Sequence, residues 1–405
     1  MNSSRRDFLR STGLGFLALG LPPAFLVRTA QAQSAKNKSL VVVFQRGAMD
    51  GLNVVVPFKD PAYYKLRPSI ALREPGTNPE SVIDLDGFYG LHPALAPLKN
   101  IYDQGQLAFI QATGSPDNTR SHFDAQDYME IGTPGIKGTP DGWLNRCLLE
   151  GASSSSNFRG VAVTAQLPRM LAGRAPALTL SSIDEFHFRN EALGNALQKL
   201  YATSQDKELR LGAENLFSAM GELKRLSAKI PVSSERYPAG QFGAGLAQIA
   251  RLIKADVGLE VAFTEIGGWD THANEGGATG QLANRLKELG EGMAAFYRDL
   301  GQRMEDVVLL TMSEFGRTAR ENGNRGTDHG HANVMFAMGG KVHGGKVYGR
   351  WPGLAPEQLN EGRDLALTTD FRTVCGEMLT RHLGQKELTN IFPNFRATAP
   401  LGILA

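Results

Sequence analysis

Short, continuous runs of apolar residues alternate with longer helical stretches along most of this 405-residue chain. A short apolar run rich in β-branched residues is typical of a strand that is buried on both faces. The predicted strands are residues 40–44, 107–111, 160–163, 259–266, 307–312 and 334–338. Between the strands at 259–266 and 307–312, residues 281–304 place large apolar side chains three and four positions apart, which predicts an amphipathic helix. This alternation favours an α/β fold with a mainly parallel sheet that helices cover on both sides.

Two adjacent arginines, Arg5 and Arg6, precede a mildly apolar stretch at residues 13–27 and a small-x-small cleavage site at residues 30–32. This order predicts a twin-arginine export signal. We therefore expect the twin-arginine translocase as a partner and a periplasmic or otherwise extracytoplasmic location. The apolar stretch is interrupted by two prolines and is shorter than the roughly 20 apolar residues that a membrane span needs, so no stable span is expected.

Cleavage of a signal peptide at residues 1–32 would leave residues 33–405, a length within reach of one large α/β domain. Residues 191–256 are rich in helical patterns and poor in strand signals. We interpret that segment as a helical insertion packed on the main sheet.

Charge and cysteine content exclude several classes of partner and site. The formal net charge of the chain is +2, and residues 1–32 contain four arginines against one aspartate, which leaves the remainder near −1. Nothing in this balance favours nucleic acid as a partner. Cys147 and Cys375 are the only cysteines, so they can form one disulfide or remain two buried thiols, and they are too few for a cysteine-based metal site.

Charged and imidazole side chains gather beside the ends of several predicted strands, where open α/β sheets place their ligand sites. They are Arg46 and Asp50 after 40–44, Asp270 and His272 after 259–266, Glu314 and Arg317 after 307–312, and Asp328, His329 and His331 before 334–338. A single aspartate at such a position is more often a turn or cap residue. Carboxylates and imidazoles clustered together, however, favour a site for one or two divalent ions, zinc or manganese.

Ser121 begins a predicted helix that continues to residue 130. A hydroxyl at this position is commonly a helix N-cap. The same position lies in the positive field of free N–H groups, where an anion binds and where a nearby metal would lower the hydroxyl pKa. Ser121 is therefore a candidate nucleophile as well as a candidate cap.

Five motifs of the chain resemble a widespread family of twin-arginine-exported bacterial proteins with a domain of unknown function. The motifs are Arg46-Gly47 with residues 50–53 (Asp-Gly-Leu-Asn), residues 120–123 (Arg-Ser-His-Phe), residues 268–272 (Gly-Trp-Asp-Thr-His), residues 313–318 (Ser-Glu-Phe-Gly-Arg-Thr) and Asp328-His329. That family is in turn distantly similar to the alkaline phosphatase and sulfatase superfamily. The resemblance implies a three-layer α/β/α sandwich, a two-metal site and a hydroxyl nucleophile at a helix start.

The resemblance also implies roles for individual residues. Ser121 takes the position of the nucleophile, and the implied metal ligands are Asp50, Asp270, His272, either Glu314 or the pair Asp328-His329, and finally His329 or His331. Two features depart from the superfamily pattern. Phe315 stands where a histidine or asparagine ligand would follow Glu314, and the sulfatase activation signature is absent after Ser121.

Two hypotheses follow from these residues. The first is an exported metal-dependent hydrolase of a small phosphate or sulfate ester, in which Ser121 attacks and Arg46, Arg120 or Arg317 binds the anion. The second is a non-catalytic periplasmic binding or assembly protein with a degenerate metal site, which Phe315 favours. A structural calcium site is the weaker alternative, because calcium prefers oxygen ligands.

Overall fold

A nine-stranded sheet forms the centre of the protein in the computed structural model, which describes residues 38–151, 156–185, 191–227 and 233–404. In spatial order its strands are β11 (Lys346–Tyr348), β5 (Leu107–Gly114), β10 (Asn333–Gly339), β9 (Val307–Met312), β1 (Ser39–Arg46), β8 (Val261–Gly267), β6 (Gly160–Ala162) and β7 (Leu178–Thr179), with β12 (Thr369–Asp370) beside β5. Among these described strands β10 is antiparallel to both neighbours, and the other pairs are parallel. The predicted export signal lies outside the described residues.

Strand β1 shows why the sheet is covered on both sides. Its side chains alternate between two apolar clusters: Val41 and Val43 belong to one, whereas Leu40, Val42 and Phe44 belong to the other. All five side chains are fully buried, because each face of the strand meets a layer of helices. A strand buried in this way needs apolar residues at every position, which is the pattern that the sequence carries.

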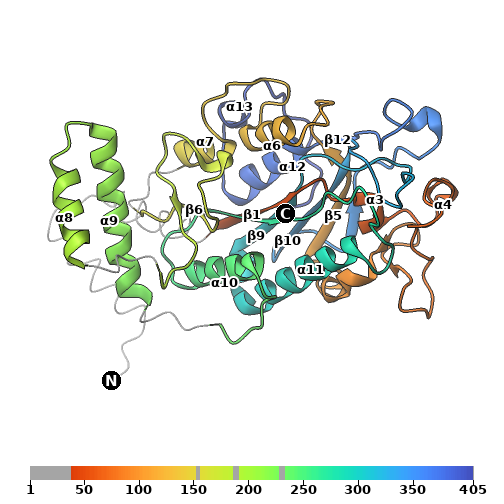
Figure 1. Cartoon of the computed structure of the whole chain (residues 1–405), viewed down its shortest axis with the longest axis horizontal. Coiled ribbons are helices and arrows are strands. Elements are labelled where there is room, and N and C mark those ends of the chain that lie inside the picture. The colour runs from red at the N-terminus through yellow and green to blue at the C-terminus, as the bar shows by residue number, and fades with distance from the viewer. Residues whose placement is uncertain (1–37, 152–155, 186–190, 228–232, 405) are drawn as a thin grey trace, which may run out of the picture.

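Helices form one layer on each face of the sheet (Figure 1). One layer contains η1 (Pro93–Leu98), α5 (Lys99–Asp103), α10 (Gln241–Lys254), α11 (Gln281–Leu300) and η3 (Gly301–Asp306). The other contains α6 (His122–Ile131), α7 (Trp143–Glu150), η2 (Arg169–Leu171), α12 (Phe371–Glu377), η5 (Met378–His382) and α13 (Leu388–Ile391). The arrangement confirms the predicted α/β fold with a mainly parallel sheet between two helical layers.

In the described part of the predicted helical insertion there are three helices with different surroundings. Helices α8 (Glu191–Ala202) and α9 (Lys207–Ser227) pack against each other and extend beyond the β6 side of the sheet (Figure 1). Helix α10 instead packs against α11 and β8 and is part of a helical layer. No helix within the described ranges is long and apolar enough to cross a membrane.

Smaller elements surround the carboxyl end of β1. They are α3 (Gly51–Val54), α4 (Pro61–Leu66), a three-stranded antiparallel sheet of β2 (Val55–Val56), β4 (Gly90–Leu91) and β3 (Ile83–Asp84), and η4 (Pro356–Gln358). Each predicted strand is present, with small shifts at its ends. The predicted helix at 281–304 is α11, which continues as the 3₁₀ helix η3.

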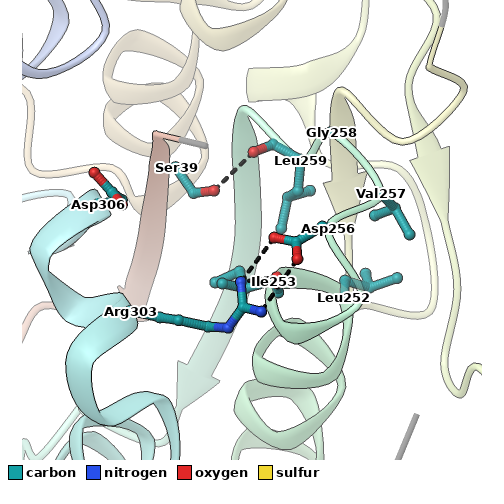
Figure 2. Close-up of a pocket in the computed structure, with 9 residues that line it drawn as sticks. All are labelled: Ser39, Leu252, Ile253, Asp256, Val257, Gly258, Leu259, Arg303 and Asp306. Carbon is teal, nitrogen blue, oxygen red and sulfur yellow. Dashed lines mark hydrogen bonds and ion pairs between the residues drawn. The ribbon is translucent and has the colours of Figure 1, made fainter. Parts of the chain in front are cut away.

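A small recess of about 30 Å³ lies at the amino-terminal edge of the sheet and has room for one water molecule. Figure 2 shows its main polar contacts: Ser39 donates to the Leu259 carbonyl, and the Arg303 guanidinium pairs with Asp256. This recess is too small for an organic ligand.

Candidate metal centre

Four loops meet at the opposite edge of the sheet because of the strand directions, and one of them joins β9 to β10. Arg46 at the end of β1 pairs with Gly267 at the end of β8, and Phe44 pairs with Met312 at the end of β9. Strand β5 ends at the same edge, and the antiparallel β10 begins there. Residues that follow β1, β5, β8 and β9, or that precede β10, are therefore brought together.

Three imidazoles converge on one carboxylate at this edge. His122, Asp270 and His329 each offer a ligand atom, and these atoms lie within 4.8 Å of one another. The Asp270 Oδ1 atom lies 3.4 Å from Nε2 of His122, 3.1 Å from Nε2 of His272 and 3.3 Å from Nε2 of His329. The Nε2 atoms of His272 and His329 are 3.0 Å apart. We call these four residues the His/Asp group.

The other ring nitrogen of each histidine meets an acceptor. Nδ1 of His122 lies 2.8 Å from Glu314 Oε1, and Nδ1 of His272 lies 3.0 Å from Asp328 Oδ1. Nδ1 of His329 lies 2.8 Å from the Arg120 carbonyl oxygen. A carbonyl or an ionised carboxylate can only accept a hydrogen bond, so each Nδ1 carries the proton. In a neutral ring Nε2 is then unprotonated and has a free lone pair.

Glu314 is fully buried and acts as the anchor of His122. Its Oε1 also accepts from the Gly47 amide and from Gln126 Nε2, at 2.8 and 2.9 Å. Burial opposes ionisation, but the hydrogen bonds from His122, Gln126 and the backbone outweigh it and hold the pKa of Glu314 below its usual value. The same hydrogen bond to Glu314 raises the pKa of His122.

Arg317 holds the Asp270 carboxylate in place. Its buried guanidinium donates to Asp270 Oδ1 at 2.6 Å, and it also donates to the carbonyl oxygens of Ala48 and Trp269. Burial opposes the ionised form of Asp270, but the charge of Arg317 outweighs this and lowers the carboxyl pKa. Burial in turn lowers the pKa of His329.

The structure brings most of the predicted site residues together at this edge of the sheet. Asp270, His272 and His329 belong to the His/Asp group, Asp328 and Glu314 each hold one of its histidines, and Arg317 holds its carboxylate. His122 was not among the predicted ligands. The tendency of ligand sites to lie at strand ends could have identified it, because His122 opens α6 at the edge where β5 ends.

Three further predicted residues, Asp50, His331 and Ser121, neither belong to the group nor hold one of its members. Asp50 is buried in an ion pair with Arg67, whose Nη2 donates to Asp50 Oδ1 at 2.8 Å. His331 is buried, and burial lowers its pKa. Ser121 is exposed at the start of α6, where its hydroxyl accepts from the Asp124 amide at 3.5 Å, so the predicted helix cap is present.

The predicted anion-binding arginines all have carboxylate partners. Arg46 pairs with Glu130 and Glu265 at 2.9 and 2.5 Å. Arg120 pairs with Glu361 and Asp364, each at 2.7 Å, and Arg317 forms an ion pair with Asp270.

The donor atoms of the His/Asp group fit a divalent metal. Imidazoles and carboxylates are common ligands of zinc. A histidine that binds a metal usually donates its other ring N–H to a carboxylate or a carbonyl oxygen, as these three histidines do. Nε2 of His122 is buried and has no hydrogen-bond partner within the described residues. That atom is available to coordinate a cation.

The fold and the group together define an α/β protein with a candidate metal centre at the carboxyl edge of its sheet. The chain belongs to the family described as "Protein of unknown function (DUF1501)", whose model matches residues 37–391. No curated protein sequence matches this chain significantly.

Solved structures to which the chain is similar include three bacterial proteins. They are the lipoteichoic acid synthase LtaP from Listeria monocytogenes (7% identity, TM-score 0.32, 76% of this chain and 66% of that chain), the PsFucS1 sulfatase from Pseudoalteromonas sp. (11%, 0.35, 80% and 66%) and the alkaline phosphatase from the Antarctic bacterium TAB5 (12%, 0.31, 77% and 94%). The chain thus spans slightly less than two thirds of the length of the first two proteins. At these TM-scores the likeness does not assign a function.

Proposed function

We propose that this protein is an exported, metal-dependent hydrolase of a small anionic ester, a phosphate or a sulfate ester. The observation that carries the proposal is the convergence of three Nε2 atoms on Asp270 Oδ1 while each Nδ1 is held by an acceptor. Lone pairs and a carboxylate oxygen this close repel one another unless a proton or a metal ion lies between them. Imidazoles outnumber carboxylates, which favours zinc over manganese or calcium.

The residues around the group suit an ester hydrolase. The bound metal would supply Lewis-acid chemistry at the ester and at an attacking hydroxyl. Ser121 precedes His122 directly, is exposed, and sits at the amino end of α6, where the free N–H groups favour an anion. In this role its oxygen loses its proton and forms the new bond to phosphorus or sulfur, while the bond to the alcohol oxygen breaks and that oxygen takes up a proton. Water later releases the acid and restores the Ser121 hydroxyl. Arg317 keeps Asp270 oriented and ionised.

A non-catalytic binding protein is the second candidate, and one observation favours it. Arg46, Arg120 and Arg317 are all paired with carboxylates, so binding of an ester by any of them would require an ion pair to break. The two candidates differ in whether Ser121 turns over a substrate, and only the hydrolase requires an intact metal site.

Metal content and turnover test the proposal. The exported protein, purified without chelator, should contain stoichiometric zinc or manganese by mass spectrometry. His329→Ala should lose the metal and His343→Ala, an exposed histidine outside the group, should keep it. A panel of phosphate monoesters, phosphate diesters and sulfate esters should then show turnover that Ser121→Ala abolishes. Absence of metal that added zinc or manganese does not restore would overturn the hydrolase; metal without turnover would favour the binding protein.

Export through the twin-arginine translocase is part of the same proposal, and the motif at Arg5 and Arg6 supports it. The double substitution Arg5→Lys and Arg6→Lys should keep the protein in the cytoplasm during cell fractionation. Unchanged export of that variant would contradict the proposed route.

A further inference from the structure

A cavity of about 580 Å³ lies beside the His/Asp group. It is bordered by α4, by residues 318–322 in the loop after β9 and by residues 354–363. Its volume falls within the range of about 300–1,000 Å³ that is usual for small-molecule sites. None of the four residues of the His/Asp group lines it.

One part of the cavity wall is apolar and another part is cationic. Leu66, Leu354 and Leu359 contribute to the apolar part and belong to, or pack on, the same hydrophobic cluster. The cationic part consists of Lys65, Arg320 and Arg363.

Two acidic side chains, Glu321 and Asp328, also line the cavity, one fewer than the cations. Glu321 accepts hydrogen bonds from Ser69 and from the Ile70 amide. Lys65 and Arg320 have no ion-pair partner in the described part of the chain. Arg363 is 3.5 Å from Asp364, a carboxylate that also binds Arg120. The cavity therefore carries unneutralised positive charge beside an apolar surface.

Two side chains that line the cavity also hold a histidine of the His/Asp group in place. Asp328 and Asn322 both line it. Asn322 Nδ2 donates to Asp328 Oδ1 at 3.0 Å and to the His272 carbonyl at 2.9 Å. Asp328 Oδ1 in turn accepts from His272 Nδ1. A ligand in the cavity would therefore touch the side chains that orient one histidine of the group.

We propose that this cavity binds a small organic anion, in which an acidic head faces Lys65 and Arg320 and a hydrocarbon or aromatic part lies on the leucine wall. The site goes beyond the proposed hydrolase, because the cavity residues are distinct from the His/Asp group and binding does not require the metal.

Phenylphosphonate is a suitable probe because its carbon–phosphorus bond resists ester hydrolysis. Calorimetric titration should show that it binds the full-length mature protein both with metal and after chelator treatment. The double variant Lys65→Met with Arg320→Met should weaken binding by about tenfold or more, because a hydrogen bond to a charged group contributes about that factor. The control Lys386→Met, an exposed lysine outside the cavity, should leave binding unchanged.

Methylphosphonate, which lacks the ring, should bind about tenfold more weakly than phenylphosphonate because less apolar surface is buried. Binding that is lost when the metal is removed, and that is unchanged in the Lys65 and Arg320 variant, would place the anion on the metal. That result would overturn the proposed cavity site but not the proposed hydrolase. No binding at millimolar phenylphosphonate would also overturn the cavity. Metal content, measured on the same samples, reports on the hydrolase separately.

Discussion

His122 donates its Nδ1 proton to Glu314, 2.8 Å away and 192 residues further along the chain. The bond fixes the ring so that Nε2 points towards Asp270. Glu314 is itself held by the Gly47 amide, Gln126 and Ser313. The orientation of one candidate ligand thus depends on a buried carboxylate that does not belong to the group.

Glu314→Gln should weaken metal binding by about 10- to 100-fold, as loss of such an outer contact usually does. The amide oxygen can still accept at the Oε1 position and the amide NH₂ can donate to Ser313, so the fold should persist. Competition with a chromophoric chelator measures the affinity, and Glu291→Gln on the exposed face of α11 is the control. Equal affinities of the two variants would contradict a role for Glu314.

Arg67→Met should destabilise the protein by about 3–5 kcal/mol, because it leaves the buried Asp50 carboxylate without its partner. Urea unfolding measures the change. The double variant Asp50→Asn with Arg67→Met should lose less, since no buried charge is left unpaired. The exposed pair Lys59–Glu74 gives the comparison, with an expected loss of at most about 1 kcal/mol for Lys59→Met. Equal losses at the two sites would refute the argument.

Glu275→Gln should flatten the dependence of stability on pH. Burial, and then the neighbouring Asp50 charge, raise the pKa of Glu275 well above its usual value. A carboxyl with a raised folded-state pKa stabilises the protein fully below its unfolded-state pKa, and this stability is lost as pH rises through the folded-state pKa. Glutamine cannot ionise, and its amide can donate to Asp50 as the protonated acid does.

The free energy of unfolding of Glu275→Gln relative to the native protein should therefore increase as the pH is raised from weakly acid to alkaline values. Urea titrations across this range provide the measurement. The hydroxyls of Thr271 and Thr327, which donate to Glu275 Oε2 at 3.0 and 2.6 Å, are retained in the variant. Parallel pH profiles for the two proteins would show that Glu275 ionises normally.

Cys147 and Cys375 are free and buried in the structure, which answers the question that the sequence left open in favour of two thiols. Burial raises the pKa of Cys147 to about 12 and also raises that of Cys375, so little reactive thiolate forms at neutral pH. A disulfide exchange reagent should therefore react slowly with the folded protein and titrate both thiols after unfolding in denaturant. Recovery of no thiol after unfolding would mean that the two cysteines pair.

The sequence predicted the strand ends well enough to bring Asp270, His272 and His329 to one edge, because buried parallel strands have a simple apolar pattern. It could not show that β10 runs antiparallel, since strand direction depends on pairing between distant segments. Nor could it separate Asp50 from the group. That outcome depends on Arg67, whose guanidinium reaches Asp50 only after α3 and α4 have packed.

His122 shows the other limit of prediction from sequence. The nearest carboxylate in the chain, Asp124, pairs with Lys137 instead, and the partners of His122, Glu314 and Asp270, come from the loops after β9 and β8. A histidine is recognised as a ligand by what holds its second nitrogen, and here that contact is entirely long-range.

The antiparallel direction of β10 has a mechanical consequence. The loop before β10 supplies His329, α6 supplies His122, and the loop after β8 supplies His272 and Asp270. An ion bound by these four side chains would cross-link two loops and the start of α6. Amide protons in all three segments would then exchange slowly and together when the ion is bound, and they would all exchange faster after its removal.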